Sequence, residues 1–421
     1  MAKARVASVT YDYYPFDIRV RRLAEAAVDA GHEMDIICLR EKGEAAREIY
    51  NGVTIHRVPY ARGFGLSLLV TAAGWVWFTL LAGWYLAWLM PRRRYDVIHV
   101  HNMPDFLVFS ALIPRLFGAR VILDVQDVSP ELLTAKSGAQ PDRRTMTRRV
   151  AELQERLSTR FADIVVTVGW PFEEKLLERG VPREKLRTII NSADPKLFPP
   201  SRRFRPDEAL TPVTPPHDAS APFIVMYWGT VAQRNGLATA VRALAIARKE
   251  VPNMRLDIMG AGRGSEIPNL LELAETLGVR DAIVLTDPGP AERIVDFIRH
   301  GDVGVIPYLI DGFADLVLPT KAYEMAWVGR PIIASDTPAI RSMFRQESML
   351  LCEAENAEAF ARAFITLAQQ PELRRDLVAN ARADYEPYRW EKMARRYADL
   401  LTWLAATPRG ALRVHPQAEI A

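Results

Sequence analysis

The chain has 421 residues, 49% of them hydrophobic and 25% charged, which is enough for about two to three domains and excludes a disordered chain or a fibrous repeat. Its 54 Lys and Arg against 51 Asp and Glu leave a net charge of only +3, too small for the charge surplus of a nucleic-acid-binding protein. The two cysteines, Cys38 and Cys352, lie far apart in apolar runs, so neither a disulfide framework nor a cysteine-based zinc site is expected.

The amino-terminal half alternates between predicted strands and helices. It opens on an apolar run at residues 6–9 with polar residues soon after it, which indicates mature structure rather than a secretion signal. A helix is predicted over residues 20–28, where apolar residues recur at helical spacing before Gly31. The later elements are strands at 34–39, 97–100, 121–124 and 164–168 and a helix at 106–117. This order predicts a parallel sheet with helices on both faces.

Residues 64–90 form an uncharged apolar segment within this half. As a helix it would be about 40 Å long, enough to cross a bilayer. A simple span would, however, separate strands that the alternating pattern places in one sheet. Four tryptophans and flanking arginines favour a helix lying in a membrane interface, with a core or dimer helix as the alternative. The residues concerned are Trp75, Trp77, Trp84 and Trp88, with Arg62 before the segment and Arg92, Arg93 and Arg94 after it; Trp77, Leu81, Trp84 and Trp88 share one helical face.

The carboxy-terminal half repeats the alternation after a proline-rich stretch. Its predicted strands are residues 223–227, 256–259, 283–285, 303–306 and 331–334, with a helix at 237–251 and a mostly helical stretch at 357–404. We expect an amino-terminal domain at 1–200, a linker at 201–221, a second domain at 222–385, a helix at 386–405 that can pack back on the first domain, and a tail at 406–421.

Residues 318–336 carry the strongest chemical signal. Thr320 is a plausible N-cap, so Lys321 and Glu324 lie near the start of a predicted helix whose amino terminus attracts anions. The carboxylate of Glu324, on an otherwise apolar helix, can accept hydrogen bonds from a vicinal diol such as a ribose. Gly329 ends this helix before the next strand.

This stretch resembles the donor-binding segment of glycosyltransferase family 4, a group of enzymes with the GT-B fold. The family pattern P-x-K-x-x-E-x-x-A-x-G-x-P-(V/I)-(V/I)-A-S is matched by Pro319, Lys321, Glu324, Ala326, Gly329, Pro331, Ile332, Ile333, Ala334 and Ser335. Further colinear landmarks are GHEM at 31–34, DVIHVH at 96–101, ILDVQDVSPE at 122–131, NSAD at 191–194, the loop 229–236 and GAG at 260–262. The resemblance covers nearly the whole chain.

The resemblance implies an α/β GT-B fold, in which two Rossmann-like domains face each other across a cleft, here with an added apolar helix in the first domain. It implies a retaining, metal-independent transferase in which a nucleotide-diphosphate sugar binds the second domain and the acceptor binds the first. No cofactor and no metal are expected. Arg234 and Lys321 would clamp the diphosphate, Glu324 would hold the ribose, and His101 and Asp127 would face the reacting sugar.

The remaining implied contacts fall on both sides of the reaction. The donor would also contact Gly229, Thr230, Asn235, Gly260, Gly262 and Thr320. The acceptor would contact Tyr14, Asp17, Arg19, Asn102, Gln126 and Glu131.

Four positions depart from the family pattern. Leu316 stands where many relatives have the first glutamate of Glu-x7-Glu, and Asp311 or Asp315 could replace it in a reshaped loop. Asn235 replaces a diphosphate-binding lysine, which leaves Arg234 as the substitute, and Gln126 replaces a histidine and cannot act as a base. Residues 14–17 (YPFD) replace the glycine pair of the first loop.

The leading hypothesis is a glycosyltransferase that uses a nucleotide sugar and a lipid-linked or glycolipid acceptor, at the cytoplasmic face of the cell membrane, in polysaccharide or glycolipid synthesis. Its partners are the donor, the acceptor and the membrane surface, with no nucleic acid, and self-association of the chain stays open. Two alternatives remain, a sugar-nucleotide epimerase of the same architecture and a non-catalytic donor-binding scaffold.

Overall fold

The computed structural model describes residues 3–62, 68–136, 146–193, 196, 221–262, 264–288 and 292–407. Its contacts group the chain into two compact units, with residues 1–191 and 391–421 in unit 1 and residues 192–390 in unit 2. The predicted linker at 201–221 and tail at 406–421 lie outside the described residues, apart from Ala221 and residues 406–407.

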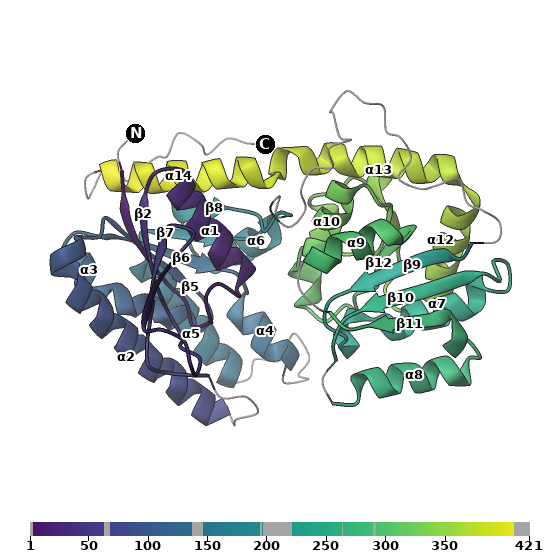
Figure 1. Cartoon of the computed structure of the whole chain (residues 1–421), viewed down its shortest axis with the longest axis horizontal. Coiled ribbons are helices and arrows are strands. Elements are labelled where there is room, and N and C mark those ends of the chain that lie inside the picture. Colours follow the sequence, from purple (N-terminus) through teal and green to yellow (C-terminus); the bar gives the residue numbers. More distant parts are fainter. Residues whose placement is uncertain are drawn as a thin grey trace. The chain divides into compact units, whose positions relative to one another are not determined.

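Unit 1 is built on an eight-stranded sheet in the order β3-β4-β2-β1-β5-β6-β7-β8 (Figure 1). All neighbouring strands are parallel except β3, which pairs antiparallel with β4. The central strands are almost wholly buried and apolar, as expected of a parallel sheet covered on both faces. The strands are β1 (Arg5–Val9), β2 (Glu33–Cys38), β3 (Arg47–Tyr50), β4 (Val53–Arg57), β5 (Val97–His101), β6 (Arg120–Val125), β7 (Ile164–Thr167) and β8 (Leu186–Thr188).

The helices of unit 1 connect these strands and cover the sheet. They are α1 (Ile18–Asp29), α2 (Leu68–Arg93), α3 (Leu112–Leu116), α4 (Ser129–Lys136), α5 (Met146–Phe161), α6 (Trp170–Glu178) and α14 (Trp390–Ala406), with 3-10 turns η1 (Asp105–Ala111) and η2 (Arg183–Lys185). Asp17 caps α1 by accepting a hydrogen bond from the Val20 backbone N–H. The predicted helix at 106–117 is wrong in its first half, which is the 3-10 turn η1.

Helix α2 packs one face against unit 1 and leaves the opposite face exposed. Phe78, Ala82 and Leu86 are fully buried, whereas Trp77, Trp84 and Trp88 are at least half exposed. Trp75 and Leu81 are half-buried, so the exposed face carries Leu80 rather than the predicted Leu81. Residues 70–93 are long and apolar enough to cross a membrane by length and composition alone. The strands before and after α2, β4 and β5, lie in the same sheet.

Unit 2 is built on a six-stranded parallel sheet in the order β11-β10-β9-β12-β13-β14. Its strands are β9 (Phe223–Trp228), β10 (Met254–Met259), β11 (Ile283–Thr286), β12 (Val303–Ile306), β13 (Ile332–Ser335) and β14 (Leu350–Cys352). Its helices are α7 (Leu237–Ala247), α8 (Glu266–Thr276), α9 (Glu292–His300), α10 (Thr320–Val328), α11 (Pro338–Arg341), α12 (Ala357–Gln369) and α13 (Pro371–Tyr385), with 3-10 turns η3 (Gln233–Asn235), η4 (Arg280–Ala282), η5 (Ala314–Leu316), η6 (Gln346–Ser348) and η7 (Glu386–Tyr388).

The predicted pair of α/β units with parallel sheets is confirmed. The mostly helical stretch predicted over 357–404 is confirmed and consists of three helices, α12, α13 and α14. Pro371 is the first residue of α13 and Pro387 lies in η7; proline lacks the N–H that a continuous helix would need at these points. Helix α14 belongs to unit 1 from Glu391 onward.

Candidate functional site

The loops after β9, β10 and β12 meet at the carboxyl edge of the unit 2 sheet, where parallel sheets bind ligands. Gly229 donates a backbone hydrogen bond to Met259 at 2.9 Å, and Val231 donates one to Ala261 at 2.8 Å. A Cβ at Gly260 would lie 2.0 Å from the Gly229 carbonyl oxygen. The close approach of the two loops therefore requires glycine at position 260.

Gly236 fixes the loop 229–236 against the chain that follows β12. It has a φ of +68°, and a Cβ there would lie 1.7 Å from the Pro307 carbonyl oxygen. The neighbouring loop backbone is also tied to this chain, because the Leu309 N–H donates to the Arg234 carbonyl at 2.9 Å. The two loops thus form one continuous rim.

Lys321 lies in the first turn of α10, at this rim. Its ammonium is 4.9 Å from the centre of the Tyr227 ring, 5.5 Å from that of Tyr308 and 3.4 Å from the Tyr308 hydroxyl. Burial lowers the pKa of Lys321, but Tyr308, Tyr227 and Glu324 outweigh this effect and raise the pKa above its usual value. The side chain therefore carries a positive charge at neutral pH, held beside aromatic faces.

Gly229 gives Lys321 its place at the rim. It has a φ of +119°, and a Cβ there would come within 3.1 Å of the Lys321 Cε and Nζ atoms. A side chain at position 229 would therefore push the ammonium away from the loop.

Glu324 lies one helical turn after Lys321. Its Oε2 accepts a hydrogen bond of 2.7 Å from the indole Nε1 of Trp228, the last residue of β9. The carboxylate is half-buried. A fixed carboxylate and a fixed ammonium thus project from one short helix toward the carboxyl edge of the sheet.

The 3-10 turn η3 presents the other predicted cation, Arg234. Its side chain is exposed, and its guanidinium carbon lies 5.1 Å from the centre of the Phe313 ring. Asn235 Nδ2 donates to the Thr230 carbonyl at 2.6 Å, and the Tyr227 hydroxyl donates to the same carbonyl at 2.7 Å. Asn235 and Thr230 therefore shape the loop that holds Arg234.

Two sequence-based details of this edge need correction. Thr320 is the first residue of α10 rather than its N-cap, which is Pro319. Asp311 closes its own turn, with Oδ1 accepting from the backbone N–H groups of Phe313 and Ala314. Asp315 is half-buried, and burial raises the pKa of its carboxyl. That either acid replaces the glutamate absent at Leu316 stays a prediction.

A second polar cluster lies at the carboxyl ends of β5 and β6 in unit 1. His101 and Asp124 are paired across these strands, with His101 Nδ1 2.9 Å from Asp124 Oδ2. Arg19 of α1 binds both Asp124 oxygens, at 2.9 and 2.7 Å, and donates to the Ile189 carbonyl at 2.9 Å. Burial favours a higher pKa for Asp124, but Arg19 and His101 outweigh it and hold that pKa far below its usual range.

The predicted contacts of His101 and Arg19 with substrate do not match this geometry. The two residues are only 1% and 4% exposed, and the second ring nitrogen of His101 lies 2.9 Å from the Ser8 hydroxyl. In this structure both side chains position Asp124 and the loop after it.

Gln126 and Asp127 form the accessible edge of this cluster, and the buried Asn102 holds them in place. Asn102 Oδ1 accepts from the Gln126 N–H at 2.8 Å, and Asn102 Nδ2 donates to the Asp127 carbonyl at 2.7 Å. Gln126 Nε2 lies 3.2 Å from His101 Nδ1. Gln126 and Asp127 are half-buried, so a contact of these two side chains with an acceptor stays a prediction.

The other predicted acceptor residues lie outside this hydrogen-bonded cluster. Tyr14 is fully buried, which corrects its predicted contact with an acceptor. Asp17 is engaged in capping α1. Glu131 is paired with Arg179, and lies 3.6 Å from Arg148, so its carboxylate supports the packing of α4, α5 and α6.

His99, His101 and Asp124 place one ligand atom each within 4.8 Å of one another, which raises the question of a metal ion. Arg19 already binds both oxygens of Asp124, and both nitrogens of His101 have protein partners. A divalent cation at this position would sit beside the Arg19 guanidinium and would have to break these bonds. The cluster therefore fits a hydrogen-bonded network better than a metal centre.

His99 connects this network to the last helix. Its Nδ1 lies 2.7 Å from the Tyr397 hydroxyl of α14, and its Nε2 is buried without a hydrogen-bond partner among the described residues. Burial, with a smaller effect of His101, lowers the pKa of His99 well below 6.5. The ring is therefore neutral in the folded protein at neutral pH.

This burial predicts a pH dependence of stability. As the pH falls below about 6.5, the unfolded chain binds a proton at His99 that the folded chain does not, so the free energy of unfolding falls by up to about 1.4 kcal/mol per pH unit. Burial also lowers the pKa of His32, which adds in the same direction. We expect His99→Gln to show a shallower decline between pH 6.5 and 5 in urea unfolding of unit 1; an unchanged slope would assign the dependence to other groups.

Comparison with known proteins gives matches over both units. A glycosyl transferase 4-like domain matches residues 17–192, and a glycosyl transferases group 1 domain matches residues 216–384. The chain is 28% identical over 337 residues to a D-inositol 3-phosphate glycosyltransferase of Acidothermus cellulolyticus, covering 76% of this chain and 71% of that protein.

Solved structures share the fold over nearly the whole chain. Sucrose-phosphate synthase from Thermosynechococcus elongatus aligns with a TM-score of 0.74 and 21% identity, over 96% of this chain and 100% of that one. Anabaena HepE in complex with UDP-glucose aligns with a TM-score of 0.67 and 14% identity, over 95% of this chain and 99% of that one.

Proposed function

Because this chain belongs to the GT4-type glycosyltransferases, which have the GT-B fold and depend on a nucleotide sugar, we propose that it transfers a sugar, with retention of configuration, to a lipid-linked or glycolipid acceptor at a membrane. The observation that carries the proposal is the pair formed by Lys321 and Glu324 on α10. Both lie at the carboxyl edge of the unit 2 sheet, Lys321 against Tyr227 and Tyr308 and Glu324 against Trp228.

We assign the donor diphosphate to Lys321 and Arg234 and the ribose diol to Glu324. The ammonium of Lys321 is charged and the Arg234 guanidinium is exposed on the facing loop. These cations offset the negative charge that develops on the diphosphate as the sugar leaves, which is electrostatic stabilisation of the transition state. Metal independence is part of this proposal, since two side-chain cations and the first turn of α10 can supply the positive charge.

The transfer step needs no nucleophile from the protein. The acceptor hydroxyl attacks the anomeric carbon from the face that the diphosphate leaves, as the sugar–phosphate bond breaks. Its proton passes to an oxygen of the departing phosphate, so the products are the glycosylated acceptor and a nucleoside diphosphate. On this account Lys321 and Arg234 act on the leaving group, while Gln126 and Asp127 in unit 1 orient the acceptor.

The exposed tryptophan face of α2 supports an acceptor held at a membrane, in polysaccharide or glycolipid synthesis at the cytoplasmic surface. Tryptophan and arginine are the side chains that favour the bilayer interface, and α2 ends in Arg92 and Arg93. The name of the Acidothermus relative suggests a second class of acceptor, a soluble phosphorylated polyol. A transfer assay with both acceptors separates the two.

Two other readings make different predictions. An epimerase of the same architecture would convert the donor without any acceptor, and it would need acid and base groups around the sugar. A donor-binding scaffold would bind the nucleotide sugar without turnover. Gln126, Asn235 and Leu316, which replace a histidine, a lysine and a glutamate of the family pattern, are the residues that favour the scaffold.

The ribose assignment predicts the effect of Glu324→Gln. A hydrogen bond to a charged carboxylate contributes about 1.5–3 kcal/mol, so the variant should bind nucleoside diphosphates about 10- to 100-fold more weakly, whereas a 2′,3′-dideoxy nucleotide should bind both proteins alike. Isothermal titration with UDP, GDP and ADP measures this and also identifies the base. Equal affinity of the unchanged protein and Glu324→Gln for the ribonucleotides would contradict the assignment of Glu324 to the donor ribose.

A further inference from the structure

Helix α5 exposes a stripe of apolar residues and buries several polar ones. Its buried positions include Glu155, Ser158 and Thr159. On the opposite side Met146, Val150, Leu153 and Leu157 are at least half exposed, between 50% and 72%, and they recur every three or four residues, which places them in one stripe. A helix on the surface of a soluble protein has the reverse pattern.

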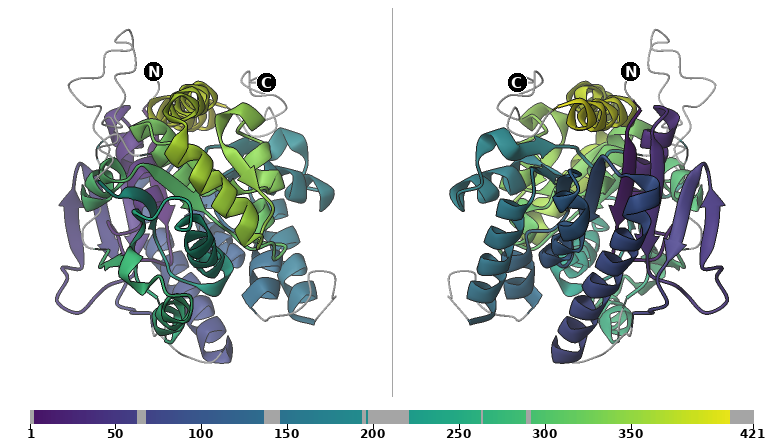
Figure 2. Two further views of the ribbon diagram at one scale, coloured as in Figure 1. Left: turned by 90° about the vertical axis from the view of Figure 1, so that its right-hand side faces the viewer. Right: turned by 90° about the vertical axis from the view of Figure 1, so that its left-hand side faces the viewer.

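Two neighbouring segments of unit 1 continue this exposed apolar surface. The turn η1 contacts both α2 and α5, and α3 contacts α2. Leu116 and Phe117, at the end of α3, are 71% and 73% exposed, and α2 exposes Trp84 by 62%. Figure 2 shows α2 and α5 on the same side of unit 1 in its right-hand view. We call the outer sides of α2, α3 and α5 the apolar face.

Exposed arginines, and no exposed acids, occur among the described residues of the three segments that form the apolar face. Within segments 68–94, 106–120 and 146–161 the exposed charges are Arg92, Arg94, Arg149, Arg156 and Arg160. The two glutamates of these segments are not exposed, since Glu155 is buried against Arg179 and Glu152 is half-buried and pairs with Arg148 at 2.8 Å. This distribution complements an anionic surface.

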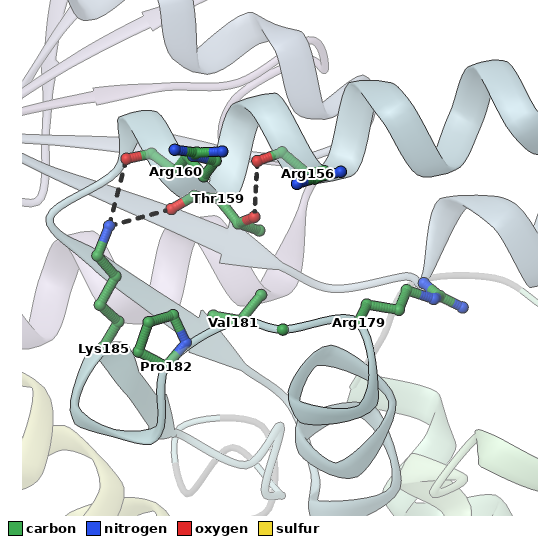
Figure 3. A pocket seen from close by; sticks show the side chains of 8 residues that line it. Arg156, Thr159, Arg160, Arg179, Val181, Pro182 and Lys185 are labelled. Carbon is green, nitrogen blue, oxygen red and sulfur yellow. Dashed lines mark hydrogen bonds between the residues drawn. The ribbon is translucent and has the colours of Figure 1, made fainter.

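The carboxyl end of α5 adds a cationic pocket of about 410 Å³, lined by Arg156, Arg160, Arg179 and Lys185 among others (Figure 3). Lys185 donates to the Arg160 carbonyl near the end of α5 at 3.2 Å and to the Ala162 carbonyl just after the helix at 2.8 Å. Arg179 is paired with Glu155 and Glu131. Arg156 and Arg160 make no ion pair or hydrogen bond from their side chains within the described residues, so their guanidinium groups are available to phosphate.

We propose that the apolar face of unit 1 lies on the surface of an anionic lipid bilayer, with Arg156 and Arg160 at the pocket binding lipid phosphate. This inference rests on the proposed function, which places the acceptor at a membrane. It extends the contact with the bilayer from α2 to α3 and α5. A second copy of the chain is the less suitable occupant, because a self-complementary interface brings identical arginine borders together. A bilayer satisfies both the apolar stripe and its arginine border.

The test is co-sedimentation of the full chain with lipid vesicles, without donor or acceptor. One set of vesicles is phosphatidylcholine alone and the other contains about one third phosphatidylglycerol. Leu153→Gln with Leu157→Gln should lower the partition coefficient about tenfold or more. Arg149→Gln, Arg156→Gln and Arg160→Gln together should lower binding to anionic vesicles about 100-fold and leave binding to neutral vesicles nearly unchanged.

The matched control carries Ile49→Gln and Val284→Gln, two exposed apolar residues that do not belong to α2, α3 or α5, and should bind vesicles like the unchanged protein. Equal vesicle binding by the Leu153/Leu157 variant would overturn the proposal, and so would a concentration-dependent dimer that this variant abolishes. Nucleotide titration of the same samples distinguishes the two claims. Nucleotide binding without vesicle binding would contradict only the contact with a bilayer, whereas vesicle binding without nucleotide binding would contradict the proposed donor site.

Discussion

Replacing Lys321 by alanine is expected to lower kcat by a factor of about 10² or more. The ammonium is held charged beside Tyr227 and Tyr308, in space that the missing side chain of Gly229 leaves open. If it stabilises the departing diphosphate, the loss falls on the transition state, so kcat falls together with kcat/KM. Steady-state kinetics with a saturating nucleotide sugar measures both constants.

Two further variants calibrate this prediction. Lys249→Ala removes an exposed cation just past the end of α7, away from the rim, and should leave kcat unchanged. Arg234→Gln should also lower kcat by about 10² if Arg234 contacts the same diphosphate. A decrease of less than about threefold for both Lys321→Ala and Arg234→Gln would contradict the assignment of the leaving group to these two residues.

Replacing Arg19 by methionine is expected to destabilise unit 1 by about 3–5 kcal/mol, because it leaves the Asp124 carboxylate buried without its main cation. The Asp124 side chain is 0% exposed, and Arg19 binds both of its oxygens. Calorimetry of the full chain measures the loss as a lower transition temperature for unit 1, with the transition of unit 2 as an internal reference.

The double variant Arg19→Met with Asp124→Asn distinguishes a lost charge pair from lost packing. Neutralising Asp124 removes the unpaired charge, so the double variant should recover at least half of the loss. Arg183→Met is the matched control, because its exposed pair with Glu173 contributes at most about 1 kcal/mol. A double variant that is no more stable than Arg19→Met would show that Arg19 stabilises unit 1 by packing alone.

The parallel strands β1, β2, β5, β6, β7 and β9 to β13 were predictable from the sequence because each contains a short apolar run. The parallel strands β4, β8 and β14 were missed because they are short or carry polar residues among the apolar ones. Strand β3 was missed because its side chains are mostly exposed and its pattern is polar. The break between η1 and α3 was missed although Pro114 signals it: the first turn of a helix does not need the N–H that proline lacks, so a new helix can begin at Leu112.

The candidate site was predictable where a charge interrupts an apolar helix, as at Glu324. The aromatic residues around Lys321 and Glu324 were missed. They are Tyr227, Trp228 and Tyr308, and aromatic residues in or next to an apolar strand are predicted to belong to the hydrophobic core. Asp124 and His99 carried a usable signal. In a strand, residues two apart share a face, so His99 and His101 point the same way, and the aligned register of β5 and β6 places Asp124 beside His101.

The polar residues assigned to the acceptor were the least predictable. Burial of Tyr14, and the pairing of Arg19 with Asp124 and of Glu131 with Arg179, depend on contacts between segments more than 30 residues apart. A motif gives the identity of such side chains but not their partners. Some charged residues next to a predicted strand end therefore support the site and others can reach a ligand, and the sequence alone does not distinguish the two kinds.

The central claim, a transferase that moves a sugar from a nucleotide to a lipid-linked acceptor, is tested most directly by nucleoside diphosphate release from purified, detergent-solubilised protein. UDP- and GDP-sugars are supplied with and without a polyprenyl-diphosphate-sugar or glycolipid acceptor, and with an inositol phosphate as the soluble alternative. We predict release of nucleoside diphosphate from one donor only when the lipid acceptor is present. Conversion of the donor without acceptor, or donor binding without any turnover, would contradict it.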